Sequence, residues 1–317
     1  MLSPRLGWTG DSALTAEEAI HNFDMGAFYT NWAQMLDDTS PNGAIGCTVP
    51  GKPGAANLPA GGSCDASWTS VYPTVLHGML KYYGDTETPS KHWASLTRFI
   101  DNEWSRIASG DITKMFANFG DWVPPPPAAK VSTQYSSAFS FLNDLRNVIF
   151  MATKLGNADD ASKYQSMWAN ASAAFHSHWF NQTQMAYADG GQTAQVMALQ
   201  LDVVPAQYKA GVVDHLVSQI IAAGNHTSCG IIGWRFECEV LSAAGHGDLA
   251  YALMTQTTYP SYGFEIQHPT EPATTIWELW DGPSEGPGMN SRDHIMFGGP
   301  GVWLYNYAGG ISQTADS

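Results

Sequence analysis

The chain has 317 residues, of which 44% are hydrophobic and 14% charged, whereas about 25% of the residues in an average globular domain are charged. Its 29 acidic and 14 basic side chains give a net charge of −15, and no cluster of Lys and Arg occurs. This balance excludes nucleic acid and anionic membrane surfaces as favourable partners. Chains of this length often fold around one core, so we predict a single domain over residues 1–317.

The predicted elements are almost all helices, because apolar residues recur at helical spacing and strand patterns are nearly absent. Helical stripes cover residues 89–107, where Pro89 and Ser90 supply a start signal, then 157–180 and 206–223. Breaks are predicted at Gly84, Gly110, Gly156 and Gly245. Ten or more helices with short connections predict an all-α array, either an open solenoid or a closed toroid, and the lack of a fixed repeat argues against a solenoid.

The cysteines and sequons indicate a secreted protein. Cys47 and Cys64 bracket a Gly/Pro-rich loop that a disulfide could staple, and Cys229 and Cys238 make the number of cysteines even. Three Asn-X-Ser/Thr sequons occur, at Asn170, Asn181 and Asn225. No signal peptide pattern opens the chain, and no apolar run approaches the roughly 18 residues needed to span a bilayer.

Three loops combine Trp, Asp, Gly and Pro, as binding loops on a helical scaffold do. The first is the opening RLGWTGD, with Trp8 and Asp11; the second is FGDWVPPPP, where the prolines force an extended chain after Asp121 and Trp122. A carboxylate that accepts hydrogen bonds from hydroxyls, next to an indole that packs on a ring, suits a sugar. Each motif alone is a weak signal.

The third loop contains TTIWELWDG, in which Trp277 and Trp280 flank Glu278 and Asp281. A carboxylate between indoles is partly desolvated, which can tune it for general acid or base work. The alternative is an ordinary amphipathic helix turn with a solvated Glu278, and the spacing alone does not separate the two.

Further along, GMNSRDH precedes a helix rich in aromatic residues and ends in His294. This histidine could hydrogen-bond a ligand hydroxyl or place a water; a satisfied structural histidine is the alternative, and the more common case. No spacing typical of a metal site, no GxSxG elbow and no phosphate-binding Gly loop occurs, so we predict no metal and no cofactor. Widely spaced Trp/Asp/Glu loops on helices fit a helical-toroid glycosidase with two opposed carboxylates.

These motifs give the chain a resemblance to the inverting α-L-rhamnosidases. The seven residues RLGWTGD match the end of that family's central motif, and five further matches follow in order: NFDMGAFYTNW, FGDW, LAYALMTQTTYPSYGF, ATTIWELWDG and GMNSRDH. The resemblance therefore covers essentially the whole chain.

The resemblance implies an (α/α)6 barrel that removes terminal α-L-rhamnose from glycosides with inversion. By position it makes Glu278 the general base, with Asp11 as the other candidate catalytic carboxylate, which in the family holds the sugar. Candidate substrate-binding residues are Trp8, Asp121, Trp122, Trp277, Trp280, Asp281 and His294. The implied ligand is a small-molecule or oligosaccharide rhamnoside, and the oligomeric state is not predicted.

One position departs from the family motif. The general acid is the Glu immediately before the Arg of RLGWTGD, and here that position is Pro4, which cannot donate a proton. The family's barrel also has helices before this motif and β-rich domains on either side, so we expect an incomplete barrel. Two alternatives stay open beside the enzyme: a carbohydrate-binding remnant without turnover, and a different (α/α)-toroid glycosidase.

Overall fold

The computed structural model describes residues 7–50, 64–107, 110–286 and 290–313, which form two compact units. The N-terminal unit lies within Arg5–Gly120 and Ser132–Phe180. The C-terminal unit consists of Asp121–Val131 and residues from Asn181 onward. Both are mostly helical, which confirms the predicted all-α class. The single domain over residues 1–317 stays a prediction.

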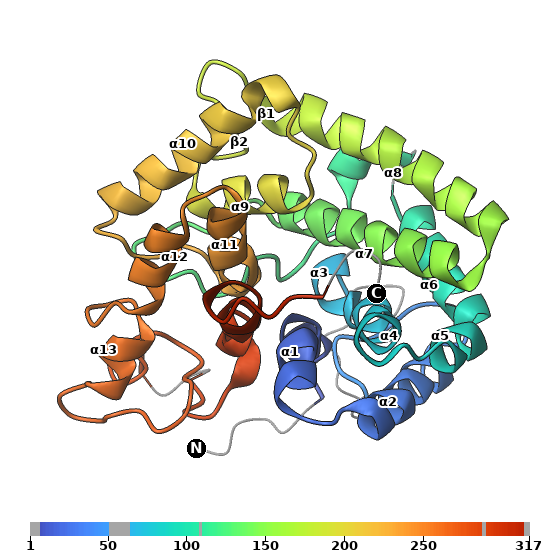
Figure 1. Ribbon diagram of the computed structural model, residues 1–317, viewed down its shortest axis with the longest axis horizontal. Coiled ribbons are helices and arrows are strands. Elements are labelled where there is room, and N and C mark those ends of the chain that lie inside the picture. Colours follow the sequence, from blue (N-terminus) through green and yellow to red (C-terminus); the bar gives the residue numbers. More distant parts are fainter. Residues whose placement is uncertain (1–6, 51–63, 108–109, 287–289, 314–317) are drawn as a thin grey trace. The chain divides into compact units, whose positions relative to one another are not determined.

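Helices of the N-terminal unit pack as neighbouring hairpins: α1 against α4, α4 against α7, and α7 against α8. Figure 1 shows α8 running beside α7 over most of its length. The elements are α1 (Thr9–Asn22), α2 (Gly26–Asp38), α3 (Ala66–Thr69), α4 (Val71–Tyr83), α5 (Glu87–Lys91), α6 (Trp93–Ser105), the 3-10 turn η2 (Ile112–Lys114), α7 (Thr133–Leu155) and α8 (Ala158–Trp179). Apolar side chains of these helices form the unit's core, with Tyr72, Phe99, Tyr135 and Phe141 fully buried.

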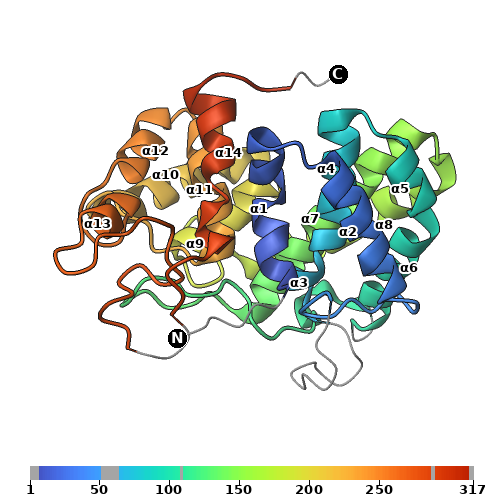
Figure 2. The ribbon, with the colours of Figure 1, turned by 90° about the horizontal axis from the view of Figure 1, so that it is seen from below.

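In the C-terminal unit, α9 packs against α10 and α11, and α11 also contacts α12 and η3. The elements are α9 (Gln192–Gln200), α10 (Ala206–Ala222), α11 (Ile231–Ala243), α12 (Gly247–Met254), α13 (Tyr262–Ile266), η3 (Ile295–Gly298), α14 (Gly301–Trp303) and the π-turn η4 (Leu304–Ala308). Two short strands, β1 (Phe180–Asn181) and β2 (Ala186–Tyr187), pair where the chain leaves α8. In Figure 2 the loops of residues 121–131 and 267–286 lie at the same end of this unit's helices.

The glycines at the predicted breaks lie outside the α-helices, and Gly84 and Gly156 are the C-caps of α4 and α7. Gly84, Gly110, Gly156 and Gly245 all have φ between 63° and 89°, a left-handed conformation that side chains other than Gly adopt at a cost. The stripe at 89–107 is not one helix, however. Helix α5 begins at Glu87 and α6 begins at Trp93, so the predicted start at Pro89 and Ser90 is wrong.

A disulfide joins Cys47 to Cys64, as the Gly/Pro-rich loop between them suggested, while Cys229 and Cys238 are buried free thiols. Of the helices within the described ranges, none is both long and apolar enough to cross a membrane. Nor do the described His, Cys, Asp and Glu side chains gather into a cluster that could hold a metal ion.

Candidate active site

Glu278 lies in an irregular segment that pairs with a second segment of the same loop. The Glu278 amide donates to Ser291 O at 2.9 Å, and the His294 amide donates to Ile276 O at 2.9 Å. Glu278 is 6% exposed and is not part of a helix. The alternative of a solvated helix turn is therefore wrong, because two backbone strands of the loop enclose this carboxylate.

The Glu278 carboxylate faces two nitrogen groups, a backbone amide and an imidazole. Its Oε2 accepts from the Ser291 amide at 2.6 Å, and its Oε1 lies 3.9 Å from His294 Nε2. His294 Nδ1 accepts from the Met296 amide at 3.4 Å and so caps η3. Because Nδ1 acts as an acceptor, a neutral His294 carries its proton on Nε2, toward Glu278. His294 therefore has a structural role as the cap of η3 and also faces the candidate base.

Trp277 is fixed from several sides by charged and aromatic groups. Its amide donates to Glu265 Oε2 at 3.5 Å, the His268 ring packs edge-on against the indole, and the Arg292 guanidinium carbon lies 5.0 Å from the indole centroid. Arg292 also forms an ion pair with Glu271 at 2.6 Å. These contacts hold the backbone that carries Glu278.

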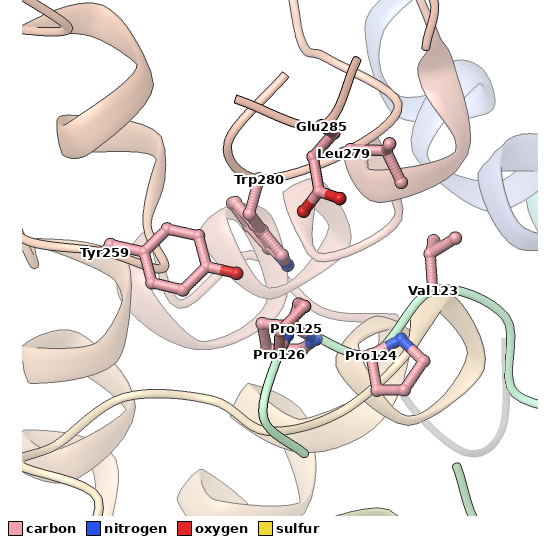
Figure 3. Close-up of a pocket in the computed structure, with 8 residues that line it drawn as sticks. All are labelled: Val123, Pro124, Pro125, Pro126, Tyr259, Leu279, Trp280 and Glu285. Carbon is pink, nitrogen blue, oxygen red and sulfur yellow. The ribbon is translucent and has the colours of Figure 1, made fainter. Parts of the chain in front are cut away.

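Trp280 lines a small pocket of about 170 Å³. The indole is 2% exposed and packs on Phe297 with centroids 4.6 Å apart, and its Nε1 finds no hydrogen-bond partner in the described part of the chain. Figure 3 shows this pocket, with Tyr259 and the loop from Val123 to Pro126 opposite Trp280. The structure therefore brings the predicted FGDWVPPPP and TTIWELWDG loops together.

Asp281 is paired with a histidine that the sequence analysis missed. His268 Nε2 lies 3.5 Å from Asp281 Oδ1, and His268 Nδ1 accepts from the amides of Thr270 and Glu271 at 3.4 and 3.3 Å. The acceptor role of Nδ1 places the proton of a neutral ring on Nε2, facing Asp281. The contact is close but is not a hydrogen bond, since Asp281 Oδ1 has no hydrogen-bond partner in the described part of the chain.

Asp121 is 1% exposed and accepts four hydrogen bonds. Its donors are the Thr193 hydroxyl at 2.7 Å and the amides of Gly230, Ile232 and Gly233 at 2.8, 2.8 and 3.1 Å. These amides begin α11, whose first N–H groups have no partner within the helix. Burial raises the pKa of Asp121, and the hydrogen bonds act in the opposite direction.

The rest of the 121–131 loop is not helical, but the predicted extended course is interrupted by a turn at Pro126 and Pro127, where the Ala128 amide donates to Pro125 O at 2.9 Å. Trp122 O accepts from the Ile231 amide at 2.9 Å, and Lys130 Nζ lies 4.1 Å from the centroid of the Trp122 indole. Val123 has φ of 46°, an unusual value for a β-branched residue that marks local strain beside the pocket.

Trp8 and Asp11 open α1 in the N-terminal unit. Trp8 forms an isolated bridge with Thr48 and packs edge-on against Phe119 at 6.0 Å, while the Asp11 carbonyl accepts from the Thr15 hydroxyl. The structure explains why the motif has a glycine at position 10, because a Cβ on Gly10 would lie 2.6 Å from the Trp68 indole. Pro4 lies outside the described residues.

Buried acids that the sequence analysis missed support both units. Asp65 Oδ2 accepts from the amides of Asn118, Phe119 and Gly120 at 2.9, 2.7 and 3.3 Å. Glu265 is 2% exposed, and burial raises its pKa to about 8. The only sequence signal for these residues is an acid among apolar neighbours, which does not name its partners.

Comparison with known proteins identifies the family. The model of the bacterial α-L-rhamnosidase six-hairpin glycosidase domain matches residues 2–308. The chain belongs to this family. Membership confirms the predicted resemblance and the (α/α)6 class.

Similar proteins of known name are rhamnosidases. An α-L-rhamnosidase of Streptomyces avermitilis is 31% identical over 97% of this chain and 29% of its own length. The structure of α-L-rhamnosidase from Dictyoglumus thermophilum superposes with a TM-score of 0.84 at 31% identity, over 95% of this chain and 34% of that one. A Streptomyces avermitilis α-L-rhamnosidase complexed with L-rhamnose gives 0.82 at 27% identity, over 95% and 28%. The chain thus spans about a third of the length of these relatives.

Proposed function

We propose that this rhamnosidase-family chain binds terminal α-L-rhamnose and takes part in its hydrolysis, with Glu278 as the general base. The observation that supports this most directly is the enclosed Glu278 carboxylate, held by the Ser291 amide and faced by His294. In an inverting glycosidase the base takes a proton from water as the water attacks the anomeric carbon. A fixed, mostly buried carboxylate is suited to that step.

The surrounding residues supply positioning. Trp280 and Asp281 lie two and three residues after Glu278, and the indole of Trp280 forms a wall of the small pocket. We assign sugar contacts to Trp277, Trp280, Asp281, His294 and Trp122 in the C-terminal unit. For Trp8 and Asp11, in the N-terminal unit, a sugar contact stays a prediction from the family motif.

Asp121 receives a different role in this proposal. The family motif includes it among the sugar contacts, but its carboxylate already accepts four hydrogen bonds. A carboxylate offers about four acceptor positions. Asp121 therefore acts on the ligand by fixing the loop that carries Trp122, and direct contact with the sugar stays a prediction from the motif.

Turnover of p-nitrophenyl α-L-rhamnoside tests the base. This leaving group departs without protonation, so the assay does not depend on a general acid. Glu278→Gln is expected to lower kcat about 10²–10⁴-fold, whereas Glu87→Gln, an exposed control on α5, leaves it unchanged. Equal rates for wild type and Glu278→Gln would remove Glu278 as the base.

The acid position separates the enzyme from a binding protein. Pro4→Glu is expected to raise the rate for a rhamnoside of an alkyl alcohol more than for the p-nitrophenyl compound, because only the alkoxide needs a proton to leave. Binding of L-rhamnose without turnover in both proteins would favour the second candidate, a carbohydrate-binding protein, which Pro4 at the acid position supports. Release of another sugar in place of rhamnose would favour a different toroid glycosidase.

We also propose that the chain matures in an oxidising compartment. The Cys47–Cys64 disulfide supports this, because such bonds persist mainly in secreted and periplasmic proteins. Two of the sequon asparagines, Asn170 and Asn181, are exposed, and Asn225 is half-buried. Mass spectrometry of the protein from its natural source tests this: a reduced Cys47 and Cys64 pair would contradict the proposal.

A further inference from the structure

The small pocket beside Trp280 shares part of its wall with a wider pocket of the C-terminal unit. The wider pocket has a volume of about 720 Å³, and both pockets are lined by Pro125, Pro126 and Tyr259. We call the two together the Tyr259 groove. The volume of the wider part falls in the range of about 300–1,000 Å³ typical of small-molecule sites. None of the predicted site residues lines it.

One side of the wider part is fixed by hydrogen bonds. The Gln192 amide group donates to His226 O at 3.1 Å and accepts from the Ser228 amide at 2.5 Å. The His226 ring is in turn paired with the Thr258 hydroxyl at 2.8 Å. Loop 226–228 is thereby tied both to the start of α9 and to the segment before Tyr259. A groove whose walls are held in this way binds without the cost of ordering them.

Two donors at the junction of the groove are unused within the described residues. Neither the Tyr259 hydroxyl nor Trp280 Nε1 forms a hydrogen bond there, and Figure 3 shows both turned toward the same space. Burial, more than the nearby carboxylates, raises the pKa of Tyr259 to about 12, so its hydroxyl keeps its proton. Trp280 Nε1 is buried without a partner in the described part of the chain, whereas Tyr259 is only half-buried, so the Tyr259 hydroxyl is the donor that a ligand in the groove can reach.

The charges along the groove are negative. Its described lining contains no Lys or Arg, whereas Glu285 lies in the small part and Asp189 in the wide part. Lys130, the nearest cation in the proline loop, lies over the Trp122 indole. An anionic ligand would meet carboxylates without a compensating cation, and like charges brought together at a binding surface weaken binding. The remaining lining is proline, alanine, tyrosine, amide and hydroxyl groups.

We propose that the Tyr259 groove binds the part of the substrate beyond rhamnose, and that this part is an uncharged ring bearing hydroxyls. The proline and tyrosine rings would pack on its flat face, while the Tyr259 hydroxyl donates to one of its oxygens. This rests on the proposed function, since it takes rhamnose to be the other end of the same ligand. It selects neutral glycosides over rhamnose linked to a uronic acid.

Ligand-observed NMR titration of the full chain tests the charge preference and also reveals any cleavage. The ligands are L-rhamnose, rhamnosyl-α-1,6-glucose and rhamnosyl-α-1,4-galacturonic acid, with a flavonol rhamnoside to compare a phenolic ring with a sugar. We expect the neutral disaccharide or the phenolic glycoside to bind about 5–10-fold more tightly than L-rhamnose, and the uronate no more tightly than L-rhamnose. Tighter binding of the uronate than of both neutral glycosides would overturn the proposal.

The same titrations separate the two proposals. No binding of L-rhamnose would contradict the proposed function itself. L-rhamnose bound as tightly as both neutral glycosides would leave that function standing and overturn only the groove.

Matched variants test the residues. Tyr259→Phe keeps the ring and is expected to weaken binding of the neutral disaccharide about 3–10-fold, the contribution of one hydrogen bond, without changing that of L-rhamnose. Tyr251→Phe is the control, since Tyr251 is 61% exposed on α12. Gln219→Lys places a cation on the groove and is expected to tighten uronate binding about 2–5-fold, unlike Gln207→Lys elsewhere on α10. Equal effects of variant and control in both pairs would contradict the groove.

Discussion

Asp121 joins a loop and a helix through a single carboxylate. Its four acceptor positions are filled by Thr193 and by three amides at the start of α11, and a Cβ at Gly230 would lie 2.7 Å from the Asp121 carboxyl carbon. The aspartate and the glycine therefore require each other. Trp122 is held at the same helix start, because its carbonyl accepts a hydrogen bond from the Ile231 amide of α11.

Replacing Asp121 by Asn should destabilise the C-terminal unit. An amide nitrogen would face N–H donors, so at least one hydrogen bond to a buried charge is lost, at a cost of about 1.5–3 kcal/mol. Urea unfolding followed by tryptophan fluorescence measures this. Asp189→Asn, at an exposed site, is expected to change the free energy of unfolding by less than about 0.5 kcal/mol; equal losses in both variants would contradict the assigned role.

The chemistry of the site residues could be predicted from sequence better than their partners. Two indoles beside Glu278 indicated a desolvated carboxylate, and Glu278 is indeed buried. Its partner Ser291 is 13 residues away, and His268 reaches Asp281 across a similar gap. Such pairings depend on how a loop closes, which local spacing does not record.

The short helix α13 carries an acidic residue, Glu265, that contacts the loop containing Glu278. Glu265 accepts from the Trp277 amide, and its other oxygen, Oε1, is buried without a partner in the described residues. Burial raises its pKa to about 8, above the ordinary value of 4.5. The folded protein therefore retains this proton over a pH range in which the unfolded chain loses it.

The sign of the pH dependence follows from that difference. The stability contributed by a protonated Glu265 is complete below pH 4.5 and is lost as the pH rises toward 8, at no more than about 1.4 kcal/mol per pH unit. Glu265→Gln removes this slope, so its stability relative to wild type should increase from pH 5 to pH 8 in urea titrations. Glu285→Gln, exposed in the same loop region, should keep the wild-type slope; if Glu265→Gln keeps it too, the assignment is wrong.

Helix ends could be predicted where a glycine imposes them, as Gly84 and Gly156 do with their left-handed conformations. The break at His92 could not, because the apolar stripe continues through it. His92 is buried, and its Nδ1 lies 3.2 Å from Asp37 of α2. Helices α5 and α6 thus meet at a buried residue with a tertiary contact, which the apolar pattern does not record.

At the scale of the whole molecule, the long collinear motifs predicted the fold and the family, and the composition gave the net charge. An acidic chain with a net charge of −15 has a groove that bears Glu285 and Asp189 and, among its described residues, no cation. The proposed preference of the groove for neutral ligands thus agrees with the excess of acidic residues in the composition. Which loops would form the groove was not visible, since Tyr259 and the proline loop are far apart in sequence.

The chain passes from one unit to the other after residue 120. A buried carboxylate forms hydrogen bonds with backbone amides on each side of this point. Asp65 holds the amides of residues 118–120, and Asp121 holds three amides of α11. Buried, hydrogen-bonded amides exchange with deuterium only when their surroundings open. Each set therefore reports the opening of its own unit.

Asp121→Asn should accelerate exchange at Gly230, Ile232 and Gly233 about 10–100-fold, as expected for the loss of 1.5–3 kcal/mol. The amides held by Asp65 should keep their protection, and hydrogen exchange followed by NMR would show both sets in one sample. Acceleration of both sets to the same extent would instead show that the units open together. Exchange at these two sets of amides would therefore measure how cooperatively the two units open.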